Sequence, residues 1–207
     1  MTDYKKPDHW QLKARKDGYP ARSVYKLQEM DDKFNLLKPL RPGPFRILDL
    51  GAAPGSWSLY ILRKKPGMFL VSADLSPLSR QYDNGLFDGG NFHFIQGDIT
   101  DTAIRDSILA HAPYNLIISD AAPATTGNRF IDTASSLEIA ETVAAYAASA
   151  LADGGNVVIK VFQGGDVSDL LKRLRTMFQT AKGYKPLACR SGSFETYYLG
   201  LKKKQHD

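Results

Sequence analysis

The chain has 207 residues, 43% of them hydrophobic, and its 27 Lys and Arg against 22 Asp and Glu give a formal net charge of +5. This composition fits one globular domain, and the single cysteine, Cys189, excludes a disulfide framework or a cysteine zinc site within the chain, so we expect no metal. No apolar run approaches the roughly 20 residues of a membrane helix, and no signal-peptide core follows Met1. We therefore expect a soluble, cytoplasmic monomer with no membrane partner.

The charges are distributed unevenly along the chain. Residues 1–46 carry eleven basic and six acidic side chains, a net of +5, and residues 172–207 carry nine and two, a net of +7. Residues 47–171 carry seven and fourteen, a net of −7. Two basic ends are typical of a protein that binds a polyanion. The acidic middle segment is expected to have a different role.

The first 45 residues predict a basic helical extension ahead of a core at 46–202, both within one domain over 1–207. Pro20 lies where a helix could begin, and apolar residues then recur at helical spacing: Val24, Leu27, Met30 and Phe34. The proline-rich run at 38–44 predicts the end of that helix.

Apolar runs that lack in-and-out alternation predict five buried strands, at 46–50, 68–73, 91–96, 115–119 and 156–162. Helical patterns separate them, at 57–65, 101–111, 133–152 and 166–182. Asp153-Gly154-Gly155 predicts the end of the third of these helices, and residues 186–202 read as two strands with a turn at 191–193. The fold class is therefore α/β, a Rossmann-like, doubly wound and mostly parallel sheet with an antiparallel terminal hairpin.

A small-residue loop follows the first strand, in Asp49-Leu50-Gly51-Ala52-Ala53-Pro54-Gly55-Ser56-Trp57-Ser58. Gly51 and Gly55 let the backbone approach a ligand, and the helix starting near Ser56 directs its amides there. The loop lacks the lysine of a phosphate-binding loop, and Ala53 breaks the dinucleotide pattern. An ordinary tight turn stays possible. Otherwise, a nucleoside ligand without a phosphate chain fits best.

Acidic residues close the next two strands. Asp74 could accept hydrogen bonds from both hydroxyls of a ribose, and Asp98 ends the third strand in the same way. Each alone is more often a cap or a turn residue. Glycine or acid at three successive strand ends is typical of S-adenosylmethionine-dependent methyltransferases.

The fourth predicted strand ends in Ser119-Asp120, and the fifth contains Lys160 within an apolar run. Buried lysines are rare without a partner. An edge-strand lysine that reaches solvent is the simpler interpretation. If Lys160 instead lies beside Asp120, the carboxylate holds the ammonium group in place, and the lysine could take a proton from a hydroxyl group.

Five segments together resemble the FtsJ (RrmJ-type) ribose 2′-O-methyltransferases, over about 21–201. They are Ala21-Arg22-Ser23-Val24-Tyr25-Lys26-Leu27, Asp49 to Ser58, Ser119 to Pro123, Lys160 to Gly164, and Arg190 to Tyr197. The resemblance implies a catalytic tetrad at Lys26, Asp120, Lys160 and Glu195. It implies S-adenosylmethionine contacts at Gly55, Trp57, Asp74, Asp98 and Asp120, to which the loop analysis adds Gly51.

The resemblance further implies that the substrate is RNA, with a uridine of large-subunit ribosomal RNA favoured. The tRNA anticodon-loop branch of the family remains an alternative, as does an RNA-binding protein without catalysis. An NAD-dependent oxidoreductase is disfavoured by the missing glycine pattern.

Two departures from the family stand out: residues 79–90 form a longer segment, and Phe194 replaces an expected basic residue beside Glu195. We expect basic residues from both ends of the chain to converge on the catalytic cleft and bind phosphates: Lys5, Lys6, Lys13, Arg15, Lys16, Arg22, Arg173, Arg175, Lys182, Lys185 and Arg190. Nearby aromatic residues could stack on bases, namely Tyr4, Trp10, Tyr19 and Tyr25. The run Lys202-Lys203-Lys204 is expected to be a solvated, disordered end.

Overall fold

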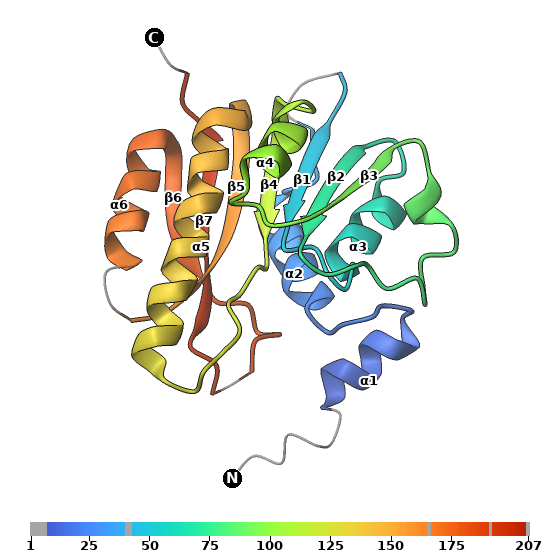
Figure 1. Ribbon diagram of the computed structural model, residues 1–207, viewed down its shortest axis with the longest axis horizontal. Coiled ribbons are helices and arrows are strands. Elements are labelled where there is room, and N and C mark those ends of the chain that lie inside the picture. The colour runs from blue at the N-terminus through green and yellow to red at the C-terminus, as the bar shows by residue number, and fades with distance from the viewer. Residues whose placement is uncertain (1–7, 40–42, 165–166, 191, 206–207) are drawn as a thin grey trace.

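The computed structural model describes residues 8–39, 43–164, 167–190 and 192–205. Tyr4, Lys5 and Lys6, for which RNA contacts are expected, lie outside these ranges. Within the described ranges, seven strands form a single sheet in the order β3-β2-β1-β4-β5-β7-β6 (Figure 1). The five strands β1 to β5 pair in parallel, and β7 is antiparallel to both of its neighbours, β5 and β6. The predicted fold class is confirmed.

The strands of the parallel part are β1 (Arg46–Leu50), β2 (Phe69–Asp74), β3 (Phe92–Gln96), β4 (Tyr114–Ser119) and β5 (Leu151–Phe162). Their alternate side chains enter two separate cores, because successive residues of a strand point to opposite faces. On one face Ile47 and Leu70 pack with residues of the helices α2 (Val24–Phe34) and α3 (Ser56–Lys64). On the other, Leu48 and Val71 pack with the remaining helices of the sheet.

The helices that cover this second face are α4 (Thr102–Leu109), α5 (Arg129–Ala150) and α6 (Val167–Met177). The side chain of Asp101 caps the first, accepting hydrogen bonds from two backbone amides, and Asn128 caps the second in the same way. Among the described residues, no helix combines the length and apolar character required to cross a membrane.

The N-terminal segment is closely packed on the rest of the fold. It contains α1 (His9–Lys16) and α2, and Val24, Leu27 and Met30 of α2 are fully buried. The expectation that prolines end α2 is wrong. The helix already ends at Phe34, because Asn35 adopts a left-handed conformation with φ of 53°.

The C-terminal elements differ most from the sequence prediction. Helix α6 ends at Met177 rather than continuing to residue 182, and β6 (Phe178–Tyr184) follows at once. Strand β6 pairs with β7 (Glu195–Lys203), so the terminal hairpin exists but its first strand precedes residue 186. The apolar spacing of α6 continues through Phe178 and Ala181, and the mostly polar edge strand gave no competing signal.

The start of β5 was also predicted incorrectly. Helix α5 ends at Ala150, ahead of the glycines, and β5 begins immediately at Leu151. Tyr114 pairs with Leu151 but Leu116 pairs with Asn156, so residues 152–155 bulge out of the ladder, with Gly154 at a φ of 78°.

Candidate active site

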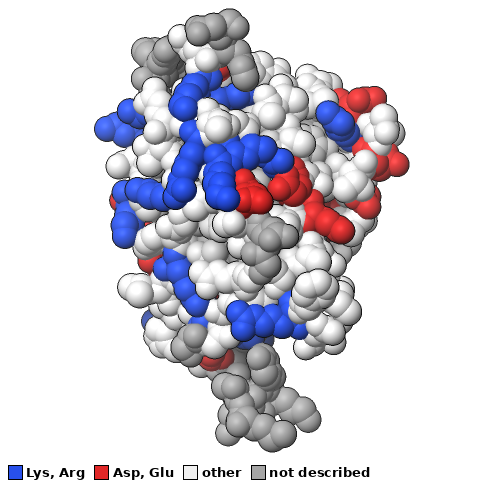
Figure 2. Space-filling model, turned by 90° about the vertical axis from the view of Figure 1, so that its left-hand side faces the viewer, with Lys and Arg blue, Asp and Glu red and all other residues white. Residues whose placement is uncertain are grey.

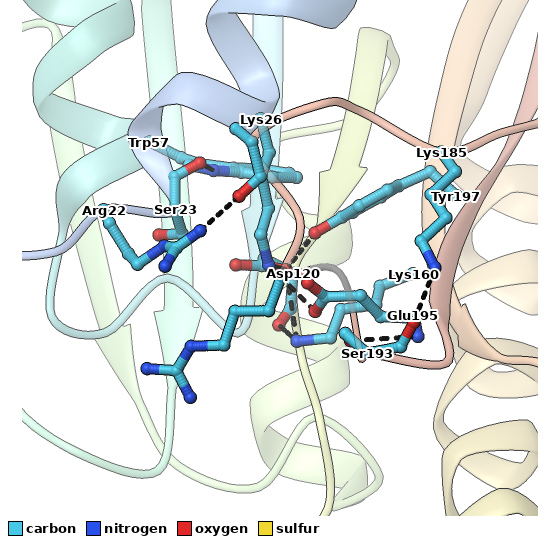
Figure 3. Close-up of polar contacts among 12 residues, drawn as sticks. Arg22, Ser23, Lys26, Trp57, Asp120, Lys160, Lys185, Ser193, Glu195 and Tyr197 are labelled. Atoms are coloured by element: carbon cyan, nitrogen blue, oxygen red, sulfur yellow. Dashed lines mark hydrogen bonds and ion pairs between the residues drawn. The ribbon is translucent and has the colours of Figure 1, made fainter. Parts of the chain in front are cut away.

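Four charged side chains from four separate elements converge at one edge of the sheet (Figure 3). The Nζ atom of Lys160 lies 3.2 Å from Oδ1 of Asp120, and that of Lys26 lies 3.9 Å from the same oxygen. Lys26 also forms an ion pair of 2.9 Å with Glu195. All four residues of the predicted tetrad are therefore brought together, with side chains only 9–16% exposed.

The sheet topology explains this convergence. Strands β4 and β5 are adjacent and parallel, so Asp120, just past the end of β4, and Lys160, near the end of β5, lie at the same edge. Strand β7 runs in the opposite direction and therefore begins at this edge, with Glu195. Helix α2 packs on the same face of the sheet as α3 and places Lys26 beside Asp120 and Glu195. Lys160 also donates a hydrogen bond of 2.9 Å to the Asp120 carbonyl oxygen, which fixes the ammonium group against β4.

The charges in the cluster stabilise one another. Burial alone would raise the pKa of Asp120, but the ammonium groups of Lys160 and Lys26 and a hydroxyl donor outweigh it, and the pKa is lowered. For Lys26, burial acts to lower the pKa, and the carboxylates of Asp120 and Glu195 overcome it and raise the pKa. Asp120 is therefore ionised and Lys26 protonated at neutral pH.

Tyr197 belongs to this cluster, although the sequence motif did not single it out as a site residue. Its hydroxyl donates a hydrogen bond of 2.6 Å to Oδ1 of Asp120, and the residue is fully buried. It lies directly opposite Lys160 in the β5–β7 ladder. The signal that could have identified it is strand periodicity, because Glu195 and Tyr197 are two apart and share a face of β7.

A cavity of about 510 Å³ opens beside the cluster, at the carboxyl ends of the parallel strands. Its lining includes four of the predicted cofactor residues, Gly51, Asp74, Asp98 and Asp120, and three residues of α5 that the sequence analysis did not identify: Glu138, Ile139 and Thr142. The volume is typical of a site for a small organic ligand. A ligand in this cavity would touch Asp120, so the cavity and the charged cluster share one residue.

The two strand-end carboxylates in this cavity are held by local hydrogen bonds. The Oδ2 atom of Asp74 accepts from the Ala53 amide at 2.9 Å, which ties the loop after β1 to β2. Asp98 accepts from the amide and the hydroxyl of Thr100, and these bonds lower its pKa. Each carboxylate retains lone pairs toward the cavity.

The glycine loop is built for close packing. Gly51 has a φ of 76°, and a Cβ atom there would lie 2.5 Å from the Cβ of Ala121. Gly55 and Trp57, by contrast, do not line the cavity. The Trp57 indole is 2% exposed and donates a hydrogen bond of 2.8 Å to the Ser23 carbonyl oxygen, so it joins α3 to the segment that leads into α2.

Asp49 is a buried acid that the sequence analysis left without a role. One of its oxygens accepts a hydrogen bond from the Ser58 hydroxyl at 2.7 Å. The other, Oδ1, is buried and has no hydrogen-bond partner among the residues that the structure describes. Burial raises the pKa of Asp49 to about 7, and the charges of Asp120 and Asp74 contribute to that rise.

The two basic ends of the chain meet beside the cluster. Arg22 forms an ion pair with Asp8, the cap of α1, and donates to the Ala188 carbonyl oxygen in the β6–β7 connection. Arg190 lies 3.6 Å from the same aspartate. The expected convergence is therefore confirmed for these segments, although Arg22 is used in a structural contact. Tyr25 is buried and donates to Asp17, so it is not available to stack on a base.

Other basic residues lie away from the cluster. Helix α6 runs antiparallel to β5, so Arg173 and Arg175, in its second half, lie toward the amino ends of the parallel strands (Figure 1). The expectation that these two residues converge on the catalytic cleft is therefore wrong. The α6 and β6 side of the molecule carries a band of Lys and Arg side chains (Figure 2). The exposed basic residues of these elements and the end of β7 are Lys172, Arg173, Arg175, Lys182, Lys202 and Lys204.

The C-terminal lysines are not a disordered end within the described residues. Lys202 and Lys203 belong to β7, and Lys203 is only 6% exposed. Its ammonium group donates to the carbonyl oxygens of Ala148 and Leu151, at 2.7 and 2.9 Å, and so caps the end of α5.

The longer segment at 79–90 supports the glycine loop. Phe87, in the short 3-10 helix η1 (Leu86–Asp88), packs so closely under Gly55 that a Cβ atom there would lie 2.9 Å from its ring. The Ser79 amide donates to the Pro54 carbonyl oxygen at 3.1 Å. The segment therefore packs under the loop that borders the cavity.

Comparison with known proteins gives consistent results. The model of the FtsJ-like methyltransferase family matches residues 19–203. The chain is 49% identical to a ribosomal RNA large subunit methyltransferase E of Treponema denticola, covering 96% of both chains. It is 41% identical to the protein of the same name from Borrelia garinii, covering 93% of this chain and 95% of the other. A crystal structure described as a ribosomal RNA methyltransferase of Plasmodium falciparum has a TM-score of 0.73 and 26% identity, covering 91% of this chain and 100% of that one.

Proposed function

Because the chain belongs to the FtsJ-like methyltransferase family, we propose that it is an RNA methyltransferase that transfers a methyl group to a ribose 2′-hydroxyl, on a uridine of large-subunit ribosomal RNA. The observation that carries the proposal is the ion-paired Lys160 beside Asp120, at the rim of a cavity of about 510 Å³. The names of the relatives favour ribosomal RNA over tRNA.

S-adenosylmethionine is the expected methyl donor, and the residues of the cavity fit it. Asp74 and Asp98 offer acceptors for ribose hydroxyls and for the polar edge of an adenine, and Asp120 offers a negative charge where a cationic methionine portion would lie. Gly51 keeps the loop free of a side chain at the point of closest packing. The bound donor supplies an already activated sulfonium methyl group, so the protein chiefly has to orient the acceptor hydroxyl and remove its proton.

Lys160 is the proposed catalytic residue. Asp120 accepts from its ammonium group through both the carboxylate and the backbone carbonyl oxygen, which holds Nζ at the edge of the cavity. A lysine fixed in this way can orient a 2′-hydroxyl by hydrogen bonding. Once the ammonium group has released a proton to solvent, the neutral amine can receive the hydroxyl proton as the oxygen forms its bond to the methyl group.

Lys26 and Glu195 are proposed to position the ribose. Their 2.9 Å ion pair lies next to Asp120 and closes the side of the cluster opposite Lys160. All four tetrad residues belong to this chain, so the proposed active site is complete within one subunit. We propose a monomeric enzyme that acts as a single domain. A ribosomal RNA substrate is consistent with a location in the cytoplasm.

The deciding experiment supplies the protein with labelled S-adenosylmethionine and, in parallel, large ribosomal subunits, naked ribosomal RNA and total tRNA. We expect label on a ribose 2′-oxygen of the large-subunit RNA, mapped by nuclease digestion and mass spectrometry. Label on a base would contradict the reaction, and label only in tRNA would contradict the substrate. Salt-sensitive RNA binding with no transfer would instead indicate a binding protein without catalysis.

A further inference from the structure

Two exposed residues at the start of α5, Arg129 and Phe130, and the half-buried ring of Phe194 have no role in the mechanism above. Phe130, in the first turn of α5, is 82% exposed. Its neighbour Arg129 lies over the half-buried ring of Phe194, with the guanidinium carbon 5.5 Å from the ring centroid. The Phe194 ring in turn packs edge-on against Phe162 at 4.7 Å. Arg129, Phe130 and Phe194, together with the buried Phe162 ring that Phe194 contacts, are called the aromatic patch below.

The patch is joined directly to the tetrad. Phe194 precedes Glu195 in the chain, and Phe162 pairs with Glu195 across the β5–β7 ladder. The Nζ atom of Lys160 lies 6.0 Å from the Phe162 ring centroid. The start of α5 lies at the same end of the molecule as α1 and the carboxyl ends of the parallel strands (Figure 1). If the ribose of one nucleotide lay at Lys160, the adjacent nucleotides of the RNA strand could contact this patch.

The backbone holds the patch in place. The Gln163 amide donates to the Phe194 carbonyl oxygen at 2.7 Å, which extends the β5–β7 pairing by one step past Glu195. Arg129 donates to the Gln163 carbonyl oxygen at 3.4 Å. The Phe194 ring is thus held by its contacts with the Phe162 ring and the Arg129 guanidinium group.

The chemistry of the patch matches that of an unpaired nucleobase. Aromatic faces stack on every base, and an arginine plane adds a cation to the stack. Proteins that act on RNA bind unpaired nucleotides chiefly in this way. The basic residue expected beside Glu195 would have bound a phosphate, whereas Phe194 places an aromatic ring there with Arg129 over it.

We propose that the aromatic patch stacks an unpaired base next to the methylated nucleotide and so positions the RNA strand across Lys160. This inference rests on the proposed function. It assigns Phe130 and Phe194 as positioning residues that contribute to RNA binding and not to the chemical step.

The test compares four variants: Phe130→Ala, Phe194→Leu, Phe194→Tyr and Ile131→Ala. Ile131→Ala is the matched control, because Ile131 is also exposed, at 47%, in the same turn of α5 but has no aromatic face. Phe130→Ala and Phe194→Leu are expected to raise KM for RNA about tenfold with kcat within twofold, since stacking on one base is typically worth this factor or more. Phe194→Tyr, which keeps the ring, and Ile131→Ala are expected to stay within twofold of the wild type.

A fluorescence readout separates this inference from the proposed function. Oligoribonucleotides of the target sequence that carry 2-aminopurine beside the methylated position are titrated with protein, and stacking is expected to quench the fluorescence with the wild type and with Phe194→Tyr. If Phe130→Ala and Phe194→Leu quenched the fluorescence as strongly as the wild type, the inference would be overturned. Unchanged binding of naked RNA combined with reduced activity on ribosomal subunits would also overturn it, and would indicate a protein partner for the patch. Quenching without methyl transfer by the wild type would contradict the proposed function while supporting the stacking.

Discussion

Two buried lysine sites lie at opposite edges of the same sheet, and their partners differ. At the carboxyl edge, Lys26 and Lys160 are paired with the carboxylates of Asp120 and Glu195. At the amino edge, Lys203 donates to two carbonyl oxygens at the end of α5. Carboxylates raise the pKa of Lys26 against the effect of burial. Burial lowers the pKa of Lys203, and the opposing charge of Asp153 does not overcome it.

This difference shows that burial of a lysine alone does not mark an active site. Lys203 completes a helix end and has no access to the cavity, while Asp120, the partner of Lys160, lines it. A buried lysine acquires a chemical role when carboxylates hold its side chain in place and a ligand cavity adjoins it. Replacing the lysine by methionine is therefore expected to reduce turnover at the carboxyl edge and to reduce only stability at the amino edge.

The largest effect is expected for Lys160→Met, which keeps the length of the side chain and removes the ammonium group. Turnover should fall by about 10²–10⁴-fold, the range typical of a lost proton acceptor. Affinity for S-adenosylmethionine, measured by calorimetry, should change little, because Lys160 does not line the cavity. Wild-type turnover in a variant that still binds the donor would contradict the assignment.

The next effect is expected for Tyr197→Phe, which removes the hydroxyl that donates to Asp120. A bond of this kind to a charged group is typically worth about 1.5–3 kcal/mol. Because the Tyr197 hydroxyl helps to lower the pKa of Asp120, its loss should raise that pKa.

The sign of the pH effect follows from linkage. A carboxyl group whose pKa is lowered by folding stabilises the native state above its unfolded pKa, and that stability is lost as the pH falls through the folded pKa. The acid unfolding transition, followed by circular dichroism, should therefore move to higher pH in Tyr197→Phe. An unchanged transition would show that the hydroxyl does not act on Asp120.

A smaller effect, on stability alone, is expected for Lys203→Met. The substitution leaves the carbonyl oxygens of Ala148 and Leu151 without their donor, which typically costs about 1–3 kcal/mol. For a chain of this size the melting temperature should fall by roughly 2–4 °C per kcal/mol. Turnover at 25 °C should match that of the wild type, and a large loss of turnover in folded protein would remove the contrast between the two edges.

The sequence predicted the carboxyl edge better than the amino edge, for a physical reason. Gly51, Asp74 and Asp120 follow buried strands directly, and parallel strands place their carboxyl ends together, so the chain order alone brings them to one cavity. Lys203 depends instead on a partner more than fifty residues away in the chain, and β6 depends on pairing with β7. Such long-range contacts leave no local pattern, which is also why α6 was predicted to continue past Met177. The role of Tyr197 required the register of β5 and β7.

The smallest expected effect is on the salt dependence of RNA binding, which should differ between basic residues near the tetrad and those at the amino edge. Lys185 belongs to the β6–β7 connection and donates to the Ser193 carbonyl oxygen at 2.6 Å, close to Glu195 in the chain. Arg175, near the end of α6, lies toward the opposite edge and serves as the matched control. The logarithm of the RNA binding constant falls linearly with the logarithm of the salt concentration. If Lys185 contacts one phosphate of the substrate, Lys185→Gln should make this slope less negative by about 0.7–0.9, whereas Arg175→Gln should leave it unchanged.

The affinity of both variants for S-adenosylmethionine serves as the control and should equal that of the wild type, because neither Lys185 nor Arg175 lines the cavity. Salt slopes reduced equally in the two variants would mean that RNA contacts the basic band of α6 as well as the tetrad edge, whereas two unchanged slopes would mean that neither residue contacts a phosphate. If both slopes were reduced, the basic residues at the C-terminal end of the chain would form one continuous RNA-binding surface. The difference between the carboxyl edge and the amino edge of the sheet would then apply only to the buried lysines.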